Sequence, residues 1–265
     1  MSHGVRALPT DGEAALVAEG LSMRFGGLVA VSQVSFALAR GGVTAMIGPN
    51  GAGKTTTFNM ISGLLAPSAG RIRFDGEDIT GRPPHRIAAL GLARTFQNVQ
   101  LFANLNAVEN VMACRYCRTR SSWLDALLCL PRDRADRRRM REAAEELLQW
   151  VGIWEKRFLM PSELPYGDQR RLEIARALAT EPRLIMLDEP SAGMLPAEAR
   201  GLMELIARLK QRGLTILLIE HNMNVVMSIS DRIVVLNFGE KIAEGDPAEI
   251  RRDPGVIEAY LGAEA

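Results

Sequence analysis

Cysteine, aromatic residues and net charge are all scarce in this sequence. It has 265 residues, of which 3 are cysteine and 5% are aromatic, and its formal net charge is +1. This small charge excludes a global attraction to nucleic acid or to an anionic membrane surface. Cys114, Cys117 and Cys129 contain one C-x-x-C, without a second pair or a neighbouring histidine, and so lack the four ligands of a structural zinc site. Unpaired thiols fit a reducing compartment.

Long hydrophobic runs are absent as well. No apolar stretch reaches the ~18 residues that span a bilayer, and residues 1–13 are polar, without the apolar core of a signal peptide. We therefore expect a flexible N-terminus at 1–13 and a chain that neither crosses nor enters the membrane by itself. With 47% hydrophobic and 24% charged residues, the remainder is long enough for one large α/β domain.

The densest group of basic residues is interleaved with acids. Such a mixture is typical of a solvated helix face rather than of a nucleic-acid patch, so we expect no nucleic-acid partner. The group consists of Arg137, Arg138, Arg139 and Arg141, among Asp133, Asp136, Glu142, Glu145 and Glu146.

Three short apolar runs, at 43–47, 184–187 and 215–219, predict buried parallel strands. Each is followed by residues suited to chemistry, namely Gly48, Asp188 and His221. Because ligands of open α/β sheets bind at the carboxyl ends of the strands, these three segments are expected to converge on one edge. A helix is predicted at 196–212, with Pro196 in its first turn and Gly213 after it, and an antiparallel hairpin at 232–237 and 241–243.

The stretch from about 101 to 180 is rich in helix formers and predicts a helical subdomain inserted into the core. Within it, the segment 121–130 (SSWLDALLCL) is unusually apolar. We favour subdomain core for this segment. The alternative is a docking surface for a membrane partner.

The residues 48–55 match the phosphate-binding pattern G-x-x-x-x-G-K-[ST], between a buried strand and an amphipathic run at 55–65 that is expected to be helical. Glycines allow backbone N–H groups to turn toward an anion, and a helix N-terminus adds positive potential. The side chain of Lys54 is expected to reach the outer phosphates, and that of Thr55 to ligate Mg²⁺. The nucleotide-contacting residues are then Gly48, Pro49, Asn50, Gly51, Ala52, Gly53, Lys54, Thr55 and Thr56.

Two adjacent acids, Asp188 and Glu189, follow the strand at 184–187. Burying charge beside an apolar strand is costly without a cation, which argues against a mere helix cap. We expect Asp188 to hold Mg²⁺, directly or through water. Glu189 is expected to orient and polarise the water that attacks the γ-phosphate, and is a candidate catalytic residue.

The segment 164–171 (LPYGDQRR), which runs into 172–178 (LEIARAL), resembles the signature helix of the ABC ATPases. The resemblance covers nearly the whole chain. Phe25 stands at the position of the adenine-stacking aromatic, Gln97 in the Arg-Thr-Phe-Gln stretch at the Q-loop, and His221 at the switch histidine. The motifs 25–31 (FGGLVAV) and 256–262 (VIEAYLG) are similar to the LivG-type subunit of branched-chain amino acid importers.

This resemblance implies a P-loop NTPase (RecA-like) core of the α/β class, with an antiparallel β subdomain and the inserted α-helical subdomain. The ABC ATPase domain would span 14–265, with a C-terminal tail at about 244–265. ATP and Mg²⁺ are the implied cofactors. Lys54, Gln97, Glu189 and His221 are the implied catalytic residues, and Gln97 joins Thr55 and Asp188 as a metal ligand.

The signature residues Tyr166, Gly167 and Asp168 are expected to contact the nucleotide bound on a partner subunit, with the Gly167 amide meeting the γ-phosphate. The carboxylate of Asp168 also suits a helix N-cap, and we favour that structural function for it. Two residues depart from the general ABC pattern. Pro165 stands where many members have serine, and Leu195 where Asp or Asn is usual, so the coupling between subunits is expected to differ.

The leading hypothesis is an ATP-hydrolysing subunit, peripheral on the cytoplasmic face of the inner membrane, that powers import of branched-chain amino acids. Its implied partners are a second ABC ATPase subunit, two transmembrane permease subunits docked near Gln97 and, indirectly, a periplasmic substrate-binding protein. The alternatives are a lipopolysaccharide-transport or other-substrate ATPase, and a nucleotide-gated subunit that hydrolyses ATP weakly. A DNA- or ribosome-directed ABC ATPase ranks last, because the long coiled coil, zinc insertion and second cassette are absent.

Overall fold

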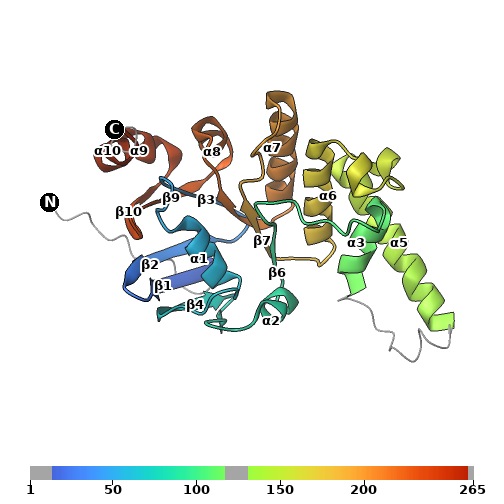
Figure 1. The fold of residues 1–265 in the computed structure, drawn as a ribbon, viewed down its shortest axis with the longest axis horizontal. Helices are drawn as coiled ribbons and strands as arrows, with labels where there is room; N and C mark the ends of the chain where they lie inside the picture. Colours follow the sequence, from blue (N-terminus) through green and yellow to red (C-terminus); the bar gives the residue numbers. More distant parts are fainter. Residues whose placement is uncertain (1–13, 117–130, 262–265) are drawn as a thin grey trace.

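A six-stranded sheet forms the centre of the molecule in the computed structural model, which describes residues 14–116 and 131–261 (Figure 1). The strand order is β10-β9-β3-β8-β7-β6, and all neighbours are parallel except β10, which is antiparallel to β9. The strands are β3 (Val43–Ile47), β6 (Leu92–Arg94), β7 (Leu184–Asp188), β8 (Thr215–Ile219), β9 (Arg232–Asn237) and β10 (Glu240–Gly245).

The three strands predicted from apolar runs are confirmed as β3, β7 and β8. Every residue in them is buried, and they lie side by side in parallel register. Their carboxyl ends therefore meet at one edge, as expected. The predicted hairpin is also confirmed, although β10 begins at Glu240 and leaves only Phe238 and Gly239 between the strands.

A second, antiparallel sheet has the order β2-β1-β4-β5. Its strands are β1 (Ala14–Phe25), β2 (Leu28–Ala39), β4 (Ala69–Phe74) and β5 (Glu77–Asp78). Phe36 on β2 and Phe74 on β4 share one buried core with Met186 and Leu217 of the central sheet. The expected α/β class with an antiparallel β subdomain is confirmed.

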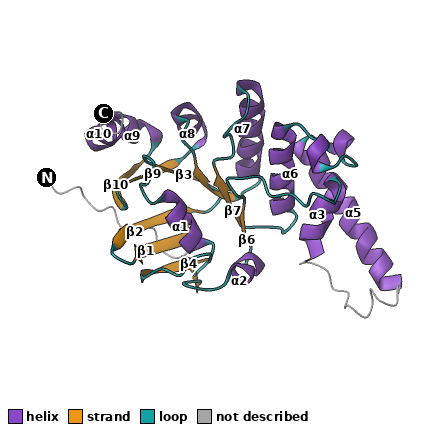
Figure 2. Cartoon of the chain, viewed as in Figure 1, coloured by secondary structure: helices purple, strands orange, loops and turns teal. Residues whose placement is uncertain are grey.

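Helices cover both faces of the central sheet (Figure 2). Phe58 of α1 packs in the core that contains Met186, whereas Leu205 of α7 packs in a separate core that contains Leu187. Because successive strand residues point to opposite faces, α1 and α7 lie on opposite sides of the sheet. These helices are α1 (Lys54–Ile61), α2 (Pro84–Ala89), α7 (Pro196–Gln211), α8 (Met223–Ile229), α9 (Pro247–Arg252) and α10 (Pro254–Leu261).

The predicted helix at 196–212 is confirmed as α7, one residue shorter at its end. The amphipathic run at 55–65 is helical only as far as Ile61. The chain turns at Gly63, whose φ is +75°, and a Cβ there would lie 2.3 Å from the carbonyl oxygen of Arg82. Helix α1 therefore ends in a glycine cap, in which the amides of Gly63 and Leu64 donate to the carbonyl oxygens of Met60 and Asn59.

The stretch from 101 to 180 contains three described α-helices, α3 (Ala107–Arg115), α5 (Pro131–Val151) and α6 (Tyr166–Leu178), and two short 3₁₀ helices, Trp154–Lys156 and Pro161–Glu163. Figure 1 shows them together at one end of the molecule, next to α7. The basic residues of α5 are solvated, as expected: Arg138, Arg139 and Arg141 are exposed, and Arg138 pairs with Glu142. The apolar segment 121–130 lies outside the described residues, as do Cys117 and Cys129. No described helix is both long and apolar enough to span a bilayer.

Candidate functional site

The phosphate-binding loop joins β3 to α1, and its shape depends on close packing at Gly48. The φ of Gly48 is +150°, and a Cβ on this residue would lie 2.1 Å from the carbonyl oxygen of Leu236 on β9. Only glycine permits that approach. The start of β2 also packs on the loop, since a Cβ on Gly53 would lie 2.8 Å from the carbonyl oxygen of Ala30. Both sheets therefore shape this loop.

Lys54 begins α1 and is buried under the loop. Its Nζ donates to the carbonyl oxygens of Gly48 at 2.7 Å and Pro49 at 2.9 Å. Burial lowers the pKa of the Lys54 ammonium, while the charges of Glu189 and Asp188 oppose this effect. The ammonium thus lies within electrostatic reach of both predicted acids, and its hydrogen bonds are to neutral carbonyls.

Glu189 is the meeting point of three segments that are far apart in the sequence. Gln97 donates from Nε2 to one carboxylate oxygen at 3.1 Å, and Nε2 of His221 lies 2.8 Å from the other. The side chain of Glu189 is only 18% exposed, whereas that of His221 is 43% exposed. Three of the predicted catalytic residues are therefore brought into direct contact, with a carboxylate at the centre.

The main chain at Glu189 is itself unusual. Its φ is +48°, a left-handed conformation that non-glycine residues rarely adopt. The amide of Glu189 donates to the carbonyl oxygen of Ile219 at 3.0 Å, and the amide and hydroxyl of Ser191 both donate to Glu220. Strain of this kind persists where the surroundings hold it, and it is concentrated at functional sites. Here the end of β8 holds the turn.

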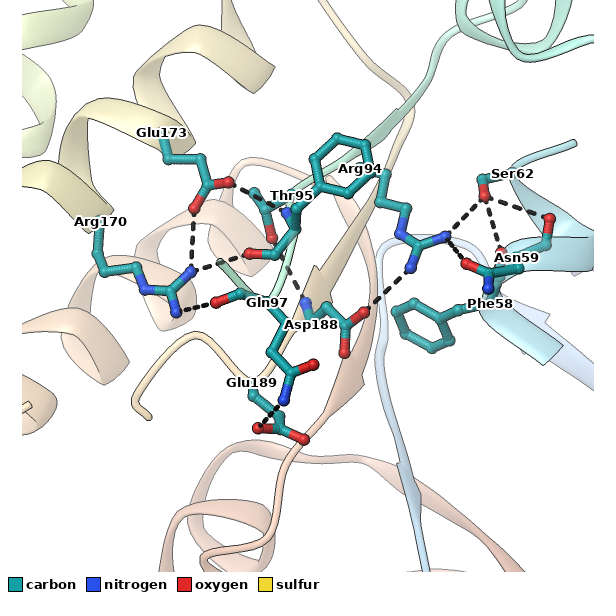
Figure 3. A network of polar contacts seen from close by, with 11 residues as sticks. Phe58, Asn59, Ser62, Arg94, Thr95, Gln97, Arg170, Glu173, Asp188 and Glu189 are labelled. Atoms are coloured by element: carbon teal, nitrogen blue, oxygen red, sulfur yellow. Dashed lines mark hydrogen bonds and ion pairs between the residues drawn. The ribbon is translucent and has the colours of Figure 1, made fainter. Parts of the chain in front are cut away.

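Asp188 is buried and forms an ion pair with Arg94 at the end of β6 (Figure 3). The Asp188 carboxylate is 3.0 Å from Arg94 Nη2, and the side chains are 3% and 8% exposed respectively. Burial raises the pKa of Asp188, and the charge of Arg94 opposes that rise. Arg94 also donates to Asn59 and Ser62 at the end of α1, and its guanidinium lies 5.6 Å from the Phe58 ring centroid.

Arg94 is a candidate site residue that sequence reasoning missed. It was recognised only as the first letter of the Arg-Thr-Phe-Gln stretch. The available signal was a charged residue at the end of a short apolar stretch, although no strand was predicted at 92–94. Because two such residues at neighbouring parallel strand ends fall close together, an ion pair could have been expected between β6 and β7.

The oxygen donors near the loop suit a hard cation. Mg²⁺ prefers oxygen ligands and is usually held by one or two carboxylates plus substrate phosphates. Thr55 is exposed in the first turn of α1, and Asp188 lies at the strand end, charged and paired. The described residues contain no group of three or more His, Cys, Asp or Glu side chains that could hold a metal by themselves. The chemistry of Thr55, Gln97 and Asp188 therefore fits a Mg²⁺ ion shared with a nucleotide.

The predicted signature residues lie at the start of α6, apart from the phosphate-binding loop. Tyr166 is the first residue of the helix and Gly167 the second, and the hydroxyl of Tyr166 accepts from Arg170. The expectation that Asp168 is the N-cap is wrong: the N-cap is Pro165, and Asp168 pairs with Lys156. None of the hydrogen bonds in the described ranges joins residues 166–168 to the loop at 48–55.

The remaining predicted residues are placed as follows. Phe25 ends β1 and is 48% exposed, beside the start of β2 that packs on the phosphate-binding loop. Leu195 is the N-cap residue of α7 and is 68% exposed, and its backbone amide donates to Glu198. Both side chains are therefore available to a ligand or a partner.

A second buried ion pair, between Arg170 and Glu173 on α6, was also missed. The spacing i, i+3 with opposite charges was visible in the sequence, but such pairs on exposed helix faces are common and contribute little. In the structure the two side chains are only 3% and 7% exposed. They contact the main chain of Phe96 and Gln97, and Figure 3 shows Arg170 and Glu173 beside Gln97.

Comparison with known proteins places this chain in a described family. Residues 31–192 match the family model of the ABC transporter, and residues 240–265 match that of the branched-chain amino acid ATP-binding cassette transporter. The chain is 49% identical to the high-affinity branched-chain amino acid transport ATP-binding protein BraF of Pseudomonas aeruginosa, over 93% of this chain and 97% of that protein. It is 45% identical to LivG of Escherichia coli, with the same coverage of both proteins.

Solved structures of ATP-binding cassettes have the same fold as this chain. The ADP conformation of an ATP-binding cassette of an ABC transporter superposes with a TM-score of 0.82 and 33% identity, covering 94% of this chain and 99% of that one. A dimeric cassette bound to ADP and phosphate shares the fold, with a TM-score of 0.74 and 24% identity, covering 88% of this chain and 98% of that one.

Proposed function

The chain belongs to the branched-chain amino acid group of ABC transporter ATP-binding proteins. On that premise we propose that Glu189 is the general base of its ATPase reaction. We also propose that ATP hydrolysis drives the import of branched-chain amino acids. The observation that carries the proposal is the convergence of Gln97 and His221 on the Glu189 carboxylate. A carboxylate held from both sides is oriented to accept a proton from water.

The nucleotide is proposed to bind along residues 48–56, with its adenine stacked on the exposed ring of Phe25. Lys54 would exchange its two carbonyl partners for phosphate oxygens, a stronger, charge-assisted interaction. Thr55, Asp188 and Gln97 would hold Mg²⁺, which when bound neutralises charge that develops on the phosphates. His221 would contact the γ-phosphate beside Glu189.

A second ATPase subunit is proposed to complete the site. The first turn of α6 offers backbone N–H groups and positive potential suited to a phosphate, yet residues 166–168 make no hydrogen bond to the loop of their own chain. We infer that Tyr166, Gly167 and Asp168 act on the nucleotide of the partner. The exposed Leu195 would then lie at the subunit interface, where it offers an apolar contact in place of a polar one.

Permease subunits are proposed to dock on a cavity of about 490 Å³ between α2, α3 and α6. Its lining is mainly apolar and includes Leu64, Ile87, Phe96, Leu101, Phe102 and Ala177. The cavity begins next to Gln97, so an apolar helix bound there would lie against the segment that contacts Glu189. This arrangement supports a peripheral location on the cytoplasmic face of the membrane, with a periplasmic binding protein delivering the amino acid from the other side.

The test is the Glu189→Gln substitution in the transporter assembled with its partner subunits. We expect ATP binding to be retained and ATP turnover to fall by ~10² or more, since the amide cannot accept the proton. Glu204→Gln, an exposed acid on α7, is the matched control and is expected to leave turnover unchanged. Undiminished hydrolysis in Glu189→Gln would refute the assignment and favour a subunit that binds ATP but hydrolyses it weakly.

The cargo is tested separately. The same assembled transporter, reconstituted in vesicles, is expected to take up leucine, isoleucine or valine only with ATP present and not to take up lysine or glutamate. Equal ATP-driven uptake of a charged amino acid would refute the proposed substrate class without affecting the assignment of Glu189.

A further inference from the structure

The loop that carries Gln97 is anchored by Arg170 and Glu173, to which the proposed chemistry assigns no contact with the nucleotide, although Glu173 also lines the cavity proposed for the permease. Residues 96–98 are exposed and lie in no helix or strand. Before them, the amide of Thr95 donates to the carbonyl oxygen of Met186, which ties the chain to β7. From residue 96 to residue 100, the hydrogen bonds to the main chain come from side chains of α6, not from the sheet.

Arg170 supplies two of those contacts. Its Nη1 donates to the carbonyl oxygen of Phe96 at 2.9 Å, and its Nη2 donates to the carbonyl oxygen of Gln97. A planar guanidinium that holds two successive carbonyls fixes both their positions and the orientation of the peptide between them. The Cα of Gln97 belongs to that restrained segment, so Arg170 sets the point from which the Gln97 side chain reaches Glu189.

Glu173 completes the arrangement. It accepts from the amide of Phe96 at 3.1 Å and lies 3.2 Å from Nη1 of Arg170. Burial raises the pKa of the Glu173 carboxyl, and the hydrogen bond from Phe96 together with the charge of Arg170 opposes this rise. Buried pairs of this kind are expensive to desolvate and contribute little net stability, so their retention calls for another explanation.

Arg170 also contacts the signature segment at the start of α6. Nε of Arg170 donates to the hydroxyl of Tyr166 at 3.1 Å, in the first turn of α6. The guanidinium of Arg170 therefore contacts two parts of the proposed mechanism. One is Tyr166, which is proposed to meet the partner's nucleotide. The other is the main chain of Gln97, whose side chain contacts Glu189. Figure 3 shows the continuous path from Glu173 and Arg170 through Gln97 to Glu189.

We infer that Arg170 and Glu173 are positioning residues, which fix the main chain of Phe96 and Gln97 to α6 and thereby set the contact between Gln97 and Glu189. The inference rests on the proposed function of Glu189. It assigns the pair no contact with nucleotide or water. A displacement of the first turn of α6 by the partner subunit would be transmitted to Gln97 through this anchor.

The decisive variant replaces both members, Arg170→Met with Glu173→Leu. Apolar replacement of a buried pair is often neutral for folding, so the melting temperature is expected to stay close to that of the wild type. In the assembled transporter we expect kcat to fall about tenfold and KM for ATP to change less than twofold, because the phosphate-binding loop is untouched. The control is Arg208→Met, which removes a guanidinium that holds the carbonyl oxygen of Trp150 on α5, and it is expected to leave both constants unchanged.

A double-mutant cycle separates positioning from general damage. In a Gln97→Ala background the paired substitution is expected to lower kcat by less than twofold, because the side chain that the anchor positions is already absent. A tenfold loss in both backgrounds, or no loss in either, would overturn the inference. Arg170→Lys should give an intermediate loss, since an ammonium keeps the charge but cannot hold two carbonyls with fixed geometry.

Hydrogen exchange tests the anchor without hydrolysis. In the isolated chain, the amide of Phe96 is expected to exchange at least about tenfold faster in the paired variant, since its charged acceptor is gone. Exchange of the Thr95 amide, which is bonded to Met186, is expected to stay unchanged. Unaltered protection of Phe96 would refute the anchor itself. A failure of Glu189→Gln to reduce hydrolysis would instead refute the proposed function and leave this result standing.

Discussion

Replacing Arg94 tests how much its ion pair with the buried Asp188 contributes to the free energy of unfolding. In the Arg94→Met variant, Asp188 keeps its position at the end of β7 but loses the ion-pair partner 3.0 Å away. Asn59 and Ser62 lose a donor at the same time. Methionine keeps most of the side-chain length but removes the charge, including the guanidinium that lies over the Phe58 ring, so the change is chiefly electrostatic.

The expected cost follows from the burial of both groups. With exposed fractions of 3% and 8%, the pair is well inside the protein. Removing one partner of a buried pair costs about 3–5 kcal/mol, because the other charge is left uncompensated. In a chain of this size, that corresponds to a fall in melting temperature of roughly 6–20 °C. An exposed pair would cost under about 1 kcal/mol.

The loss of stability in Arg94→Met should become larger as pH rises. Burial already raises the pKa of Asp188 above its ordinary value, and without Arg94 the rise is larger. A carboxyl group with a raised pKa binds its proton more tightly in the folded state than in the unfolded state. Its contribution to the free energy of unfolding is therefore fully present below the unfolded pKa and is lost as pH rises through the folded pKa. The deficit of Arg94→Met relative to wild type should therefore be largest at pH 8 and shrink toward pH 5.

The assay is urea unfolding of both proteins at pH 8 and pH 5, with the midpoint and slope fitted separately. Adding Asp188→Asn to Arg94→Met should recover part of the lost stability at pH 8, because a neutral amide is cheaper to bury than an unpaired carboxylate. A deficit below about 1 kcal/mol at pH 8, or one that does not shrink on acidification, would refute the reasoning.

Two further substitutions test the geometry of the loop and of α3. Gly48→Ala would place a Cβ 2.1 Å from the carbonyl oxygen of Leu236, so the loop must shift. Fluorescent-nucleotide titration is expected to show at least a tenfold loss of ATP affinity. An affinity equal to that of the wild type would contradict the packing. Asn106→Ala removes one half of a capping box with Glu109 and should lower the free energy of unfolding by about 1 kcal/mol, whereas Asn106→Ser should retain it; equal losses in both would contradict the cap.

Local sequence patterns were sufficient for the parts of the fold that depend on local chemistry. Periodicity, capping and turn residues act over a few positions, so local patterns were enough to predict the buried strands at 43–47, 184–187 and 215–219, the helix after Pro196 and the phosphate-binding loop. Convergence of the strand ends also followed, since the carboxyl ends of neighbouring parallel strands share an edge. Helix ends were less predictable: the amphipathic pattern continues to residue 65, but α1 ends at Ile61 because Gly63 adopts a positive φ and closes the helix with a glycine cap.

The prediction for Asp168 failed because its carboxylate pairs with a residue outside its own helix. A carboxylate near a helix start suggests a cap, but the competing partner, Lys156, is supplied by another element. Proline at 165 took the N-cap position instead. Sequence alone does not rank a local hydrogen bond against a tertiary ion pair.

What the sequence by itself determined is the set of chemical groups in this protein: the phosphate-binding loop, the two acids at the end of β7 and the histidine after β8. Tertiary structure alone decided how these groups are held. The pairing of Arg94 with Asp188, the contacts of Gln97 and His221 with Glu189, and the anchoring of Phe96 by α6 each join residues more than thirty positions apart. The physical reason is that charge is tolerated in a buried site only where a partner comes within hydrogen-bonding distance, and such distances are set by packing rather than by spacing along the chain.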